Sequence, residues 1–316
     1  MSKCASVVAP RRRTWVRRGV SVAGILTLLV VAWLGSHLLP RHAHFVERRG
    51  TLVEATVTED SPREPALANE LVHVRADTGL AVSFRVLRPA AGDTPRPLFV
   101  MLAGHRTGRD AVDVVGPQHD MAIAALDYPY AGPEKIRSLR QGIVALPVIQ
   151  RALLDTPPAA SLALDWLITQ PWVDPDRVEL VGVSLGTPFA AVAGALDPRF
   201  RRVWLVHGGA RHREWLDGAL RDKISSPALR GAAASLGYLL AHGASFDTDH
   251  WVARIAPRPV VVIGAREDET LTTANTEDLF NAAGEPRQLF WTDGGHITTR
   301  RPEVVRALLA IAIAEL

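Results

Sequence analysis

The stretch VELVGVSLGTPFAAVAGAL, residues 178–196, constrains the fold more than any other part of the sequence. Its first six residues form an apolar run, which is typical of a strand buried on both faces. The small residues after Gly186 predict a helix. Only Gly182-Val183-Ser184-Leu185-Gly186 connects the two, so the chain must turn tightly there. Such a turn strains the serine backbone, and side chains at the flanking glycines would collide with strand or helix. We therefore predict a strand–turn–helix unit that exposes the Ser184 hydroxyl above a sheet.

Apolar runs of this kind alternate with helical patterns along the rest of the chain, which favours a mostly parallel sheet with helices on both faces. The expected strands are Leu71–Ala76, Ala81–Leu87, Leu98–Ala103, Ala122–Leu126, Val178–Val183, Val203–Val206, Val260–Ile263 and Gln288–Thr292. The expected helices cover 138–154, 158–169, 186–195, 227–241, 273–283 and 302–315. We expect an α/β fold with a doubly wound, eight-stranded sheet, in which residues 210–255 form helices that cover part of the pocket.

Composition indicates a globular protein whose basic residues are concentrated at one end. Of 316 residues, 47% are hydrophobic and 22% charged, which suffices for a sizeable core. Residues 1–50 hold nine Lys or Arg and one acid, whereas the remainder holds 27 basic and 32 acidic residues. The overall charge of +3 therefore belongs to the N-terminal segment, and the acidic remainder gives no support for nucleic-acid binding.

Residues 19–40 contain no Asp, Glu, Lys or Arg. As a helix these 22 residues would rise about 33 Å, enough for a hydrocarbon core of about 30 Å. More basic residues precede the stretch than follow it, which predicts a cytoplasmic N-terminus. We expect a basic leader with a single transmembrane anchor over 1–45, a linker over 46–70 and a catalytic domain over 71–316. Within the linker, the stretch LVEATV is compatible with one short edge strand. A cleaved secretory signal and a buried globular helix are the alternatives; an anchor or a signal places the body outside the cytoplasm.

The G-x-S-x-G pattern is weak in a chain with 24 glycines, but its strand–turn–helix setting is the one that a nucleophile elbow requires. With this motif, residues 70–316 resemble the α/β-hydrolase superfamily, particularly its dienelactone-hydrolase-like and prolyl-oligopeptidase-like branch. The resemblance implies a catalytic serine, acid and histidine in that chain order. Ser184 is the expected nucleophile.

The expected acid is Asp268, because it follows the apolar run PVVVIG at the place where the superfamily carries its acid. Asp293 is the alternative, although it lies close in sequence to the expected base. That base is His296, which follows Gly294-Gly295 and precedes the last helical pattern. A serine hydroxyl is a poor nucleophile at neutral pH, so it needs a base within hydrogen-bond reach and an acid to orient that base.

The resemblance also implies an oxyanion hole made of two backbone N–H groups. One belongs to Leu185, the residue after the nucleophile. The other comes from the loop Ala103-Gly104-His105-Arg106, where His105 is the expected donor and Arg106 the alternative. The run His207-Gly208-Gly209 looks similar but follows the nucleophile, so we interpret it as a turn at the rim of the site.

These features predict a serine hydrolase, most simply a carboxylic ester hydrolase of class EC 3.1.1 that forms an acyl-enzyme. A small serine peptidase or amidase and a catalytically silent, membrane-anchored binding module are the alternatives. The expected partners are a small-molecule ester and a membrane, but no nucleic acid. The sequence lacks C-x-x-C, His-Glu-x-x-His, a P-loop and G-x-G-x-x-G, so no metal or other cofactor is expected.

Overall fold

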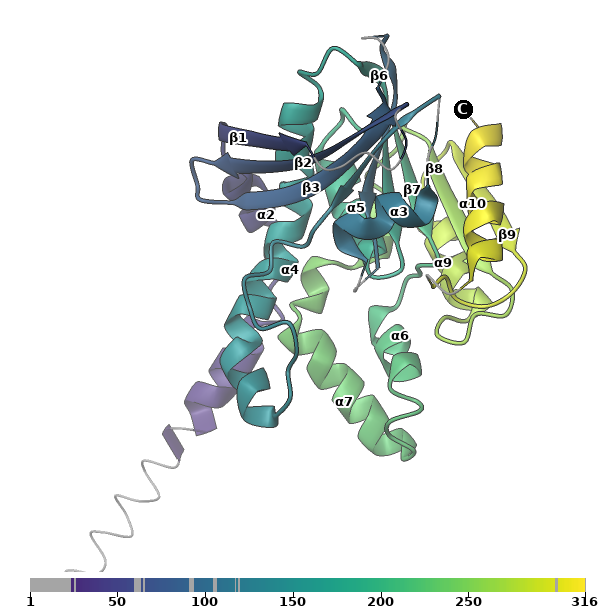
Figure 1. The fold of residues 1–316 in the computed structure, drawn as a ribbon. Helices are drawn as coiled ribbons and strands as arrows, with labels where there is room; N and C mark the ends of the chain where they lie inside the picture. The colour runs from purple at the N-terminus through teal and green to yellow at the C-terminus, as the bar shows by residue number, and fades with distance from the viewer. Residues whose placement is uncertain are drawn as a thin grey trace, which may run out of the picture.

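A computed structural model describes residues 24–25, 27–59, 64, 66–90, 94–104, 107–116, 118, 120–298 and 301–315. A twisted nine-stranded sheet forms its centre, in the order β1-β2-β3-β5-β4-β6-β7-β8-β9 (Figure 1). The strands are β1 (Leu52–Glu59), β2 (Leu67–Ala76), β3 (Ala81–Pro89), β4 (Arg96–Leu102), β5 (Ala122–Leu126), β6 (Val173–Val183), β7 (Arg202–Val206), β8 (Val260–Ala265) and β9 (Arg287–Thr292). β1, β2 and β3 pair antiparallel, β3 pairs antiparallel with β5, and the remaining pairs are parallel.

Helices cover both faces of this sheet. The longer ones are α2 (His42–Arg49), α4 (Leu139–Leu167), α5 (Gly186–Leu196), α6 (His212–Ala219), α7 (Pro227–Leu240), α9 (Thr273–Ala282) and α10 (Pro302–Ala314). The short ones are η1 (Gly108–Asp110), α3 (Ala111–Val115), η2 (Gly243–Ser245) and α8 (Thr248–Val252). α2, α4, α5, α8 and α9 contribute to the larger buried cluster on one face. α3 and α10 cover a smaller cluster on the other.

The mostly parallel α/β architecture agrees with the sequence prediction, but the strand number does not: nine strands form the sheet, not eight. The ninth strand, β1, lies within the predicted linker 46–70, at the stretch LVEATV that is compatible with a short edge strand. All of its side chains beyond Leu52 are exposed, so it carries only a weak apolar pattern. The preceding helix α2 also packs onto the body, because Phe45 is buried in the larger core and His44 and Arg48 both contact the Asp155 carboxylate of α4.

α4 is a single helix, whereas the sequence predicts a break between residues 154 and 158. Pro157 and Pro158 lie inside it and are both buried. A proline removes one helical hydrogen bond and usually ends or kinks a helix. Here α4 continues as far as Leu167, and residues 159–164 are also buried, so packing of its second half against the sheet holds the helical path.

Within the described residues, no helix combines the length and the apolarity needed to cross a membrane. Residues 19–23 and 26 of the expected anchor lie outside the described residues. Residues 27–36 are helical, and His37 next to them stacks on His242 at 4.5 Å between ring centroids. Figure 1 shows this segment beside the N-terminal half of α4, at the end of the molecule where α6 and α7 also extend away from the sheet.

Candidate functional site

The turn between β6 and α5 holds Ser184 in the strained conformation that the sequence predicts. Its φ is 53°, in the left-handed region, and its N–H donates to the Val206 carbonyl of β7 at 2.8 Å. A Cβ at Gly182 would lie 2.8 Å from the Gly186 carbonyl oxygen, and one at Gly186 would overlap the Leu102 carbonyl of β4. The two glycines are therefore required by close backbone approach.

The structure brings three of the predicted residues into one hydrogen-bonded line. Ser184 Oγ lies 2.8 Å from His296 Nε2, and His296 Nδ1 lies 2.7 Å from Asp268 Oδ2. Both distances are within the range of a good hydrogen bond. With Nδ1 donating to the carboxylate, Nε2 accepts from the serine hydroxyl. The arrangement can therefore remove a proton from Ser184 while a negative charge faces the imidazolium that forms.

Asp268 is held by more than the histidine. Its side chain is buried, and the backbone N–H groups of Thr270 and Leu271 each donate to Oδ1 at 2.8 Å. Burial alone would raise the pKa of Asp268, but the hydrogen bond and charge of His296 together with these amides hold it below its usual value. The carboxylate is thus ionised at neutral pH. Asp293, the alternative acid, has a fully exposed side chain that faces Arg266.

An ion pair that the sequence did not indicate, between Glu269 and Arg301, fixes the backbone of His296. The His296 N–H donates to Glu269 Oε2 at 3.0 Å, and Arg301 Nη1 donates to the His296 carbonyl at 2.8 Å. Glu269 and Arg301 are themselves paired, with Oε1 and Nη2 2.6 Å apart. The hydrogen bond from Arg301 lowers the pKa of Glu269 to about 2. The pair therefore hydrogen-bonds to the peptide groups on both sides of His296.

The sequence pattern predicts that His207 belongs to a turn at the rim of the site. In the structure it lies under the histidine loop instead. It is 1% exposed, and its Nδ1 accepts the Ile297 N–H at 2.9 Å. Nε2 therefore carries the proton and donates to Thr292 Oγ1 at 3.1 Å, which in turn contacts the Gly264 carbonyl. Burial lowers the pKa of His207 to about 4, with the charge of His296 adding to the effect. A neutral imidazole that makes two hydrogen bonds thus supports Ile297, the residue next to His296.

Of the expected oxyanion donors, Leu185 lies within the described residues. Leu185 follows Ser184 at the N-terminus of α5, where backbone N–H groups point toward the site. Gly104 lies on the other side, since a Cβ there would be 4.0 Å from the Ser184 Cβ. His105 and Arg106, the two candidates for the second donor, lie outside the described residues.

His207, Asp268 and His296 also have the residue types of a metal site, with ligand atoms within 4.8 Å of one another. A bound metal would need a free lone pair from each residue. His207 Nδ1 is engaged by a backbone N–H, and His296 Nδ1 is engaged by the carboxylate itself. The hydrogen bonds therefore account for this cluster, and its residues do not fit a metal ion.

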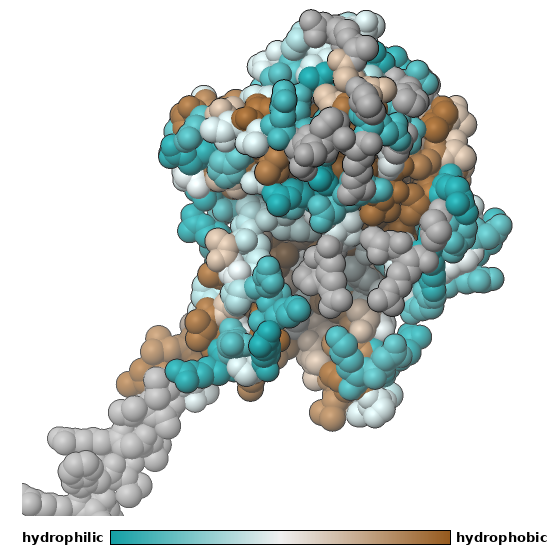
Figure 2. Space-filling view, in the orientation of Figure 1, coloured by the Kyte–Doolittle hydropathy of each residue, from teal (hydrophilic) through white to brown (hydrophobic). Residues whose placement is uncertain are grey.

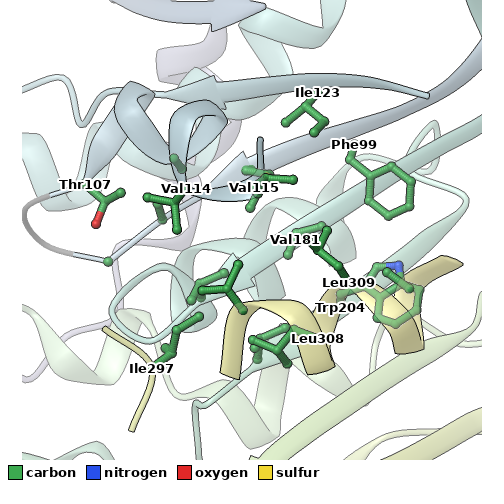
Figure 3. A pocket seen from close by; sticks show the side chains of 18 of the residues that line it. Phe99, Thr107, Val114, Val115, Ile123, Val181, Trp204, Ile297, Leu308 and Leu309 are labelled. Carbon is green, nitrogen blue, oxygen red and sulfur yellow. The ribbon is translucent and has the colours of Figure 1, made fainter. Parts of the chain in front are cut away.

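An apolar cavity of about 760 Å³ begins at Ser184. It runs between the sheet and the two helices α3 and α10; Figure 3 shows Thr107 and Ile297 at one end and Phe99 and Trp204 at the other. None of its lining residues comes from 210–255, so the expectation that this segment covers the pocket is wrong. Residues 210–255 do form helices, but Trp251 is buried in the core of the opposite face.

Part of the chain matches known proteins in sequence. A model described as the Abhydrolase family matches residues 155–290, which include Ser184 and Asp268 but end before His296. A thiohydrolase from Arthrinium phaeospermum is 38% identical over 72 residues, which are 20% of this chain and 24% of that protein. The match thus spans about a quarter of the length of that curated relative.

Among solved structures, an acetyl xylan esterase from Paenibacillus sp. R4 is similar with a TM-score of 0.62 at 18% identity, over 90% of this chain and 93% of that one. Acetyl xylan esterase 1 from Thermoanaerobacterium sp. JW/SL YS485 gives 0.58 at 15% identity, over 87% and 92%. The α/β-hydrolase GrgF from Penicillium sp. sh18 gives 0.54 at 16% identity, over 83% and 97%. At these identities the likeness establishes the fold.

Proposed function

Because the chain belongs to the α/β-hydrolase superfamily, we propose that it is a serine hydrolase that cleaves carboxylic esters through an acyl-enzyme. The observation that carries this proposal is the hydrogen-bonded line from Ser184 Oγ through His296 to Asp268. The names of the similar proteins, two acetyl xylan esterases and a thiohydrolase, support acyl-transfer chemistry on an oxygen or sulfur ester.

In the first half of the reaction, Ser184 Oγ attacks the ester carbonyl while its proton passes to His296 Nε2. The carbonyl carbon becomes tetrahedral, and Leu185 N–H with a second amide from the Gly104–Arg106 loop holds its oxyanion. The carbon–oxygen bond to the alcohol then breaks, and His296 returns the proton to that leaving oxygen. One such backbone donor is worth about 2.7–4 kcal/mol in the transition state.

In the second half, water replaces the alcohol. His296 takes a proton from the water, whose oxygen attacks the acyl carbon, and the bond to Ser184 Oγ breaks as that oxygen regains a proton. The products are a carboxylic acid and free enzyme. Asp268 stays ionised throughout, because its hydrogen bonds hold its pKa below the usual value.

Labelling with a fluorophosphonate probe tests the proposal. We expect the folded wild-type chain to react covalently and Ser184→Ala to be unreactive. Ser235→Ala, which alters a serine of α7 remote from the line, should react as wild type does. Hydrolysis of p-nitrophenyl acetate, the matching thioester and the anilide then separates esterase, thioesterase and amidase activity. A folded wild-type chain that reacts with none of these would favour a silent binding module.

We also propose that the N-terminal segment attaches the chain to a membrane with the catalytic body outside the cytoplasm. The uncharged stretch 19–40 and the basic residues before it support this. Apolar side chains at this end of the molecule are exposed, among them Leu28, Leu139 and Val144 at 69%, 83% and 73%. Figure 2 shows apolar side chains along the N-terminal helical segment at the lower left.

Alkaline extraction of membranes from cells that express the full chain tests this attachment. An anchored chain stays with the membrane, and protease added outside the cytoplasm digests its body. Release into the supernatant together with loss of the first residues from the purified protein would indicate a cleaved secretory signal.

A further inference from the structure

The cavity at Ser184 is polar at one end only. Its hydroxyl groups belong to Thr107, Ser184 and Thr298, which all follow the C-terminal ends of strands. The rest of the lining is apolar: aliphatic, aromatic and thioether side chains from β4 to β8, from α3 and α10, and from adjoining loops. A ligand with one polar end and a long apolar remainder matches this distribution.

The length of the cavity follows from its floor. The floor residues run from Ala103, directly after β4 and beside the catalytic edge, back along β4 to Phe99. Four residue steps at about 3.3 Å each give a floor of about 13 Å, the length of an extended chain of about ten carbons. On β6, Val183 and Val181 line the same path beneath Ser184, so the floor starts at the nucleophile itself.

The far end is closed by polar groups behind Trp204. Its indole N–H donates to the Glu179 carboxylate, which is 6% exposed. The Arg202 guanidinium lies 5.6 Å from the Trp204 ring and donates to the Glu315 carbonyl beyond α10 at 2.9 Å. An alkyl chain that extended past Trp204 would have to displace these paired polar groups, which sets a limit on its length.

The wall opposite the sheet is thin and partly open. α3 has only five residues, and α10 faces the cavity with Leu308, Leu309 and Ala312, all partly exposed. Figure 2 shows apolar side chains gathered over α10. In a packed core this space would be filled, since interiors hold few voids larger than a water molecule. A space of 760 Å³ that is lined by apolar groups and begins at the nucleophile is suited to an apolar part of the substrate.

We propose that this cavity binds the acyl chain of the substrate, so that the enzyme prefers esters of medium-chain fatty acids, about eight to ten carbons long by the floor length above. The inference rests on the proposed esterase function and goes beyond it. The ester carbonyl lies at Ser184, the chain extends along β4 and β6 beneath α10, and its methyl end meets Trp204. Each buried methylene contributes a factor of about four to kcat/KM at most.

The first test keeps the leaving group fixed and varies the acid. The full chain is assayed with p-nitrophenyl esters from acetate to dodecanoate, below their aggregation limits. We expect kcat/KM to rise at least about 30-fold from acetate to octanoate, well below the ceiling of about fourfold per methylene, and to stop rising near decanoate. A flat profile over acyl length overturns the proposal. So does a dependence on alcohol length alone in a series of alkyl acetates.

Two variants narrow the cavity from opposite walls. Val181→Phe fills it from the sheet and Leu309→Trp from α10, and each should lower the ratio of the octanoate to the acetate kcat/KM at least tenfold. Ile313→Ala is the matched control on α10, because Ile313 is 52% exposed and does not line the cavity. It should leave the ratio as in wild type. Melting temperatures identify a variant that fails to fold, and the second wall then still tests the proposal.

Binding without turnover separates this inference from the proposed function. Calorimetric titration of Ser184→Ala with sodium decanoate should show saturable binding that sodium acetate lacks and that Val181→Phe removes. Decanoate binding with no hydrolysis of any ester by wild type would refute the esterase but support the acyl site. Hydrolysis with a flat acyl profile and no decanoate binding would keep the esterase and refute the acyl site.

Discussion

On one face of the sheet, α4, α5, α8 and α9 pack into a core in which Phe84, Phe189, Phe200 and Trp251 are buried completely or nearly so. On the other face, α3 and α10 leave a cavity of about 760 Å³ above strands of the same sheet. The same strands build both faces, because alternate residues point to opposite sides. Figure 1 shows the short helix α3 and the helix α10 over this second face of the sheet.

The difference shows how one sheet can serve stability and function separately. Close packing on the first face holds β6 and β7 in register, and this register fixes the Ser184 turn through its bond to Val206. The second face can then remain open beside the nucleophile. The residues that place the base, His207 and the Glu269–Arg301 pair, lie at the edge that both faces share.

The largest expected effect compares Phe84 on the packed face with Phe99 on the cavity face. Phe84→Ala should lower the free energy of unfolding by about 3–5 kcal/mol, since it adds a new void to a filled core. Phe99→Ala should cost at least about 1 kcal/mol less, because its side chain already borders open space. Urea titration of both variants measures the difference. Equal losses would mean that the cavity face is packed as tightly as the other.

The next effect is a pH dependence of stability that arises from two buried histidines, His207 at the site and His212 away from it. Burial lowers the pKa of each to about 4. Between pH 6.5 and 4 each stays neutral in the folded state but binds a proton when unfolded. Stability is therefore fully present above pH 6.5 and falls as pH drops toward 4, by up to about 1.4 kcal/mol per pH unit for one proton. His207→Asn and His212→Asn should each reduce this slope by about one proton.

Activity separates the same two variants. His207→Asn should also lower kcat, because the Ile297 N–H loses its acceptor beside His296. His212→Asn should leave kcat as in wild type, since His212 bonds to Thr248, away from the site. Urea titrations over pH 4–7 and ester assays at pH 7.5 measure the two effects. Equal kcat values for both variants would remove His207 from the positioning of the base.

These histidines also show which parts of the molecule the sequence could predict. The order of Ser184, Asp268 and His296 follows from local strand, glycine and helix patterns that the superfamily shares. His207 looked like part of a glycine turn, because nothing in its neighbouring sequence indicates that residues 292 and 297 come to lie against it. Burial and partners of this kind arise from packing between segments about 90 residues apart.

The same limit explains the other differences. Glu269 and Arg301 are 32 positions apart, and charged residues in loops are usually solvated. The local sequence therefore does not predict their hydrogen bonds to the backbone of His296. The sequence of β1 indicates an edge strand only weakly, and the predicted sheet left it out, because an exposed edge strand lacks the apolar alternation that marks half-buried strands. The cavity depends on which helices fail to cover the sheet, and the periodicity of single segments does not contain that information.

A smaller effect is expected at the Glu269–Arg301 pair. Arg301→Met should lower kcat about tenfold, or about 1.4 kcal/mol in the activation barrier, because the His296 carbonyl loses its donor and the loop its ion pair. KM should change little, since Arg301 does not line the cavity. Arg266→Met is the control: Arg266 faces the exposed Asp293 in the same region and does not contact His296. If both variants lower kcat equally, general electrostatics at the edge accounts for the loss.

The smallest expected effect returns to the thin wall over the cavity. Leu309→Ala should lower the free energy of unfolding by less than about 1 kcal/mol, well below the 2–5 kcal/mol typical of a packed leucine. Leu164 in α4, which is fully buried on the opposite face, provides the packed comparison as Leu164→Ala. The physical reason is that Leu309 removes little apolar area from water while the cavity is empty. Added decanoate should therefore raise the melting temperature of wild type more than that of Leu309→Ala, because a bound chain supplies the contacts that the empty wall lacks.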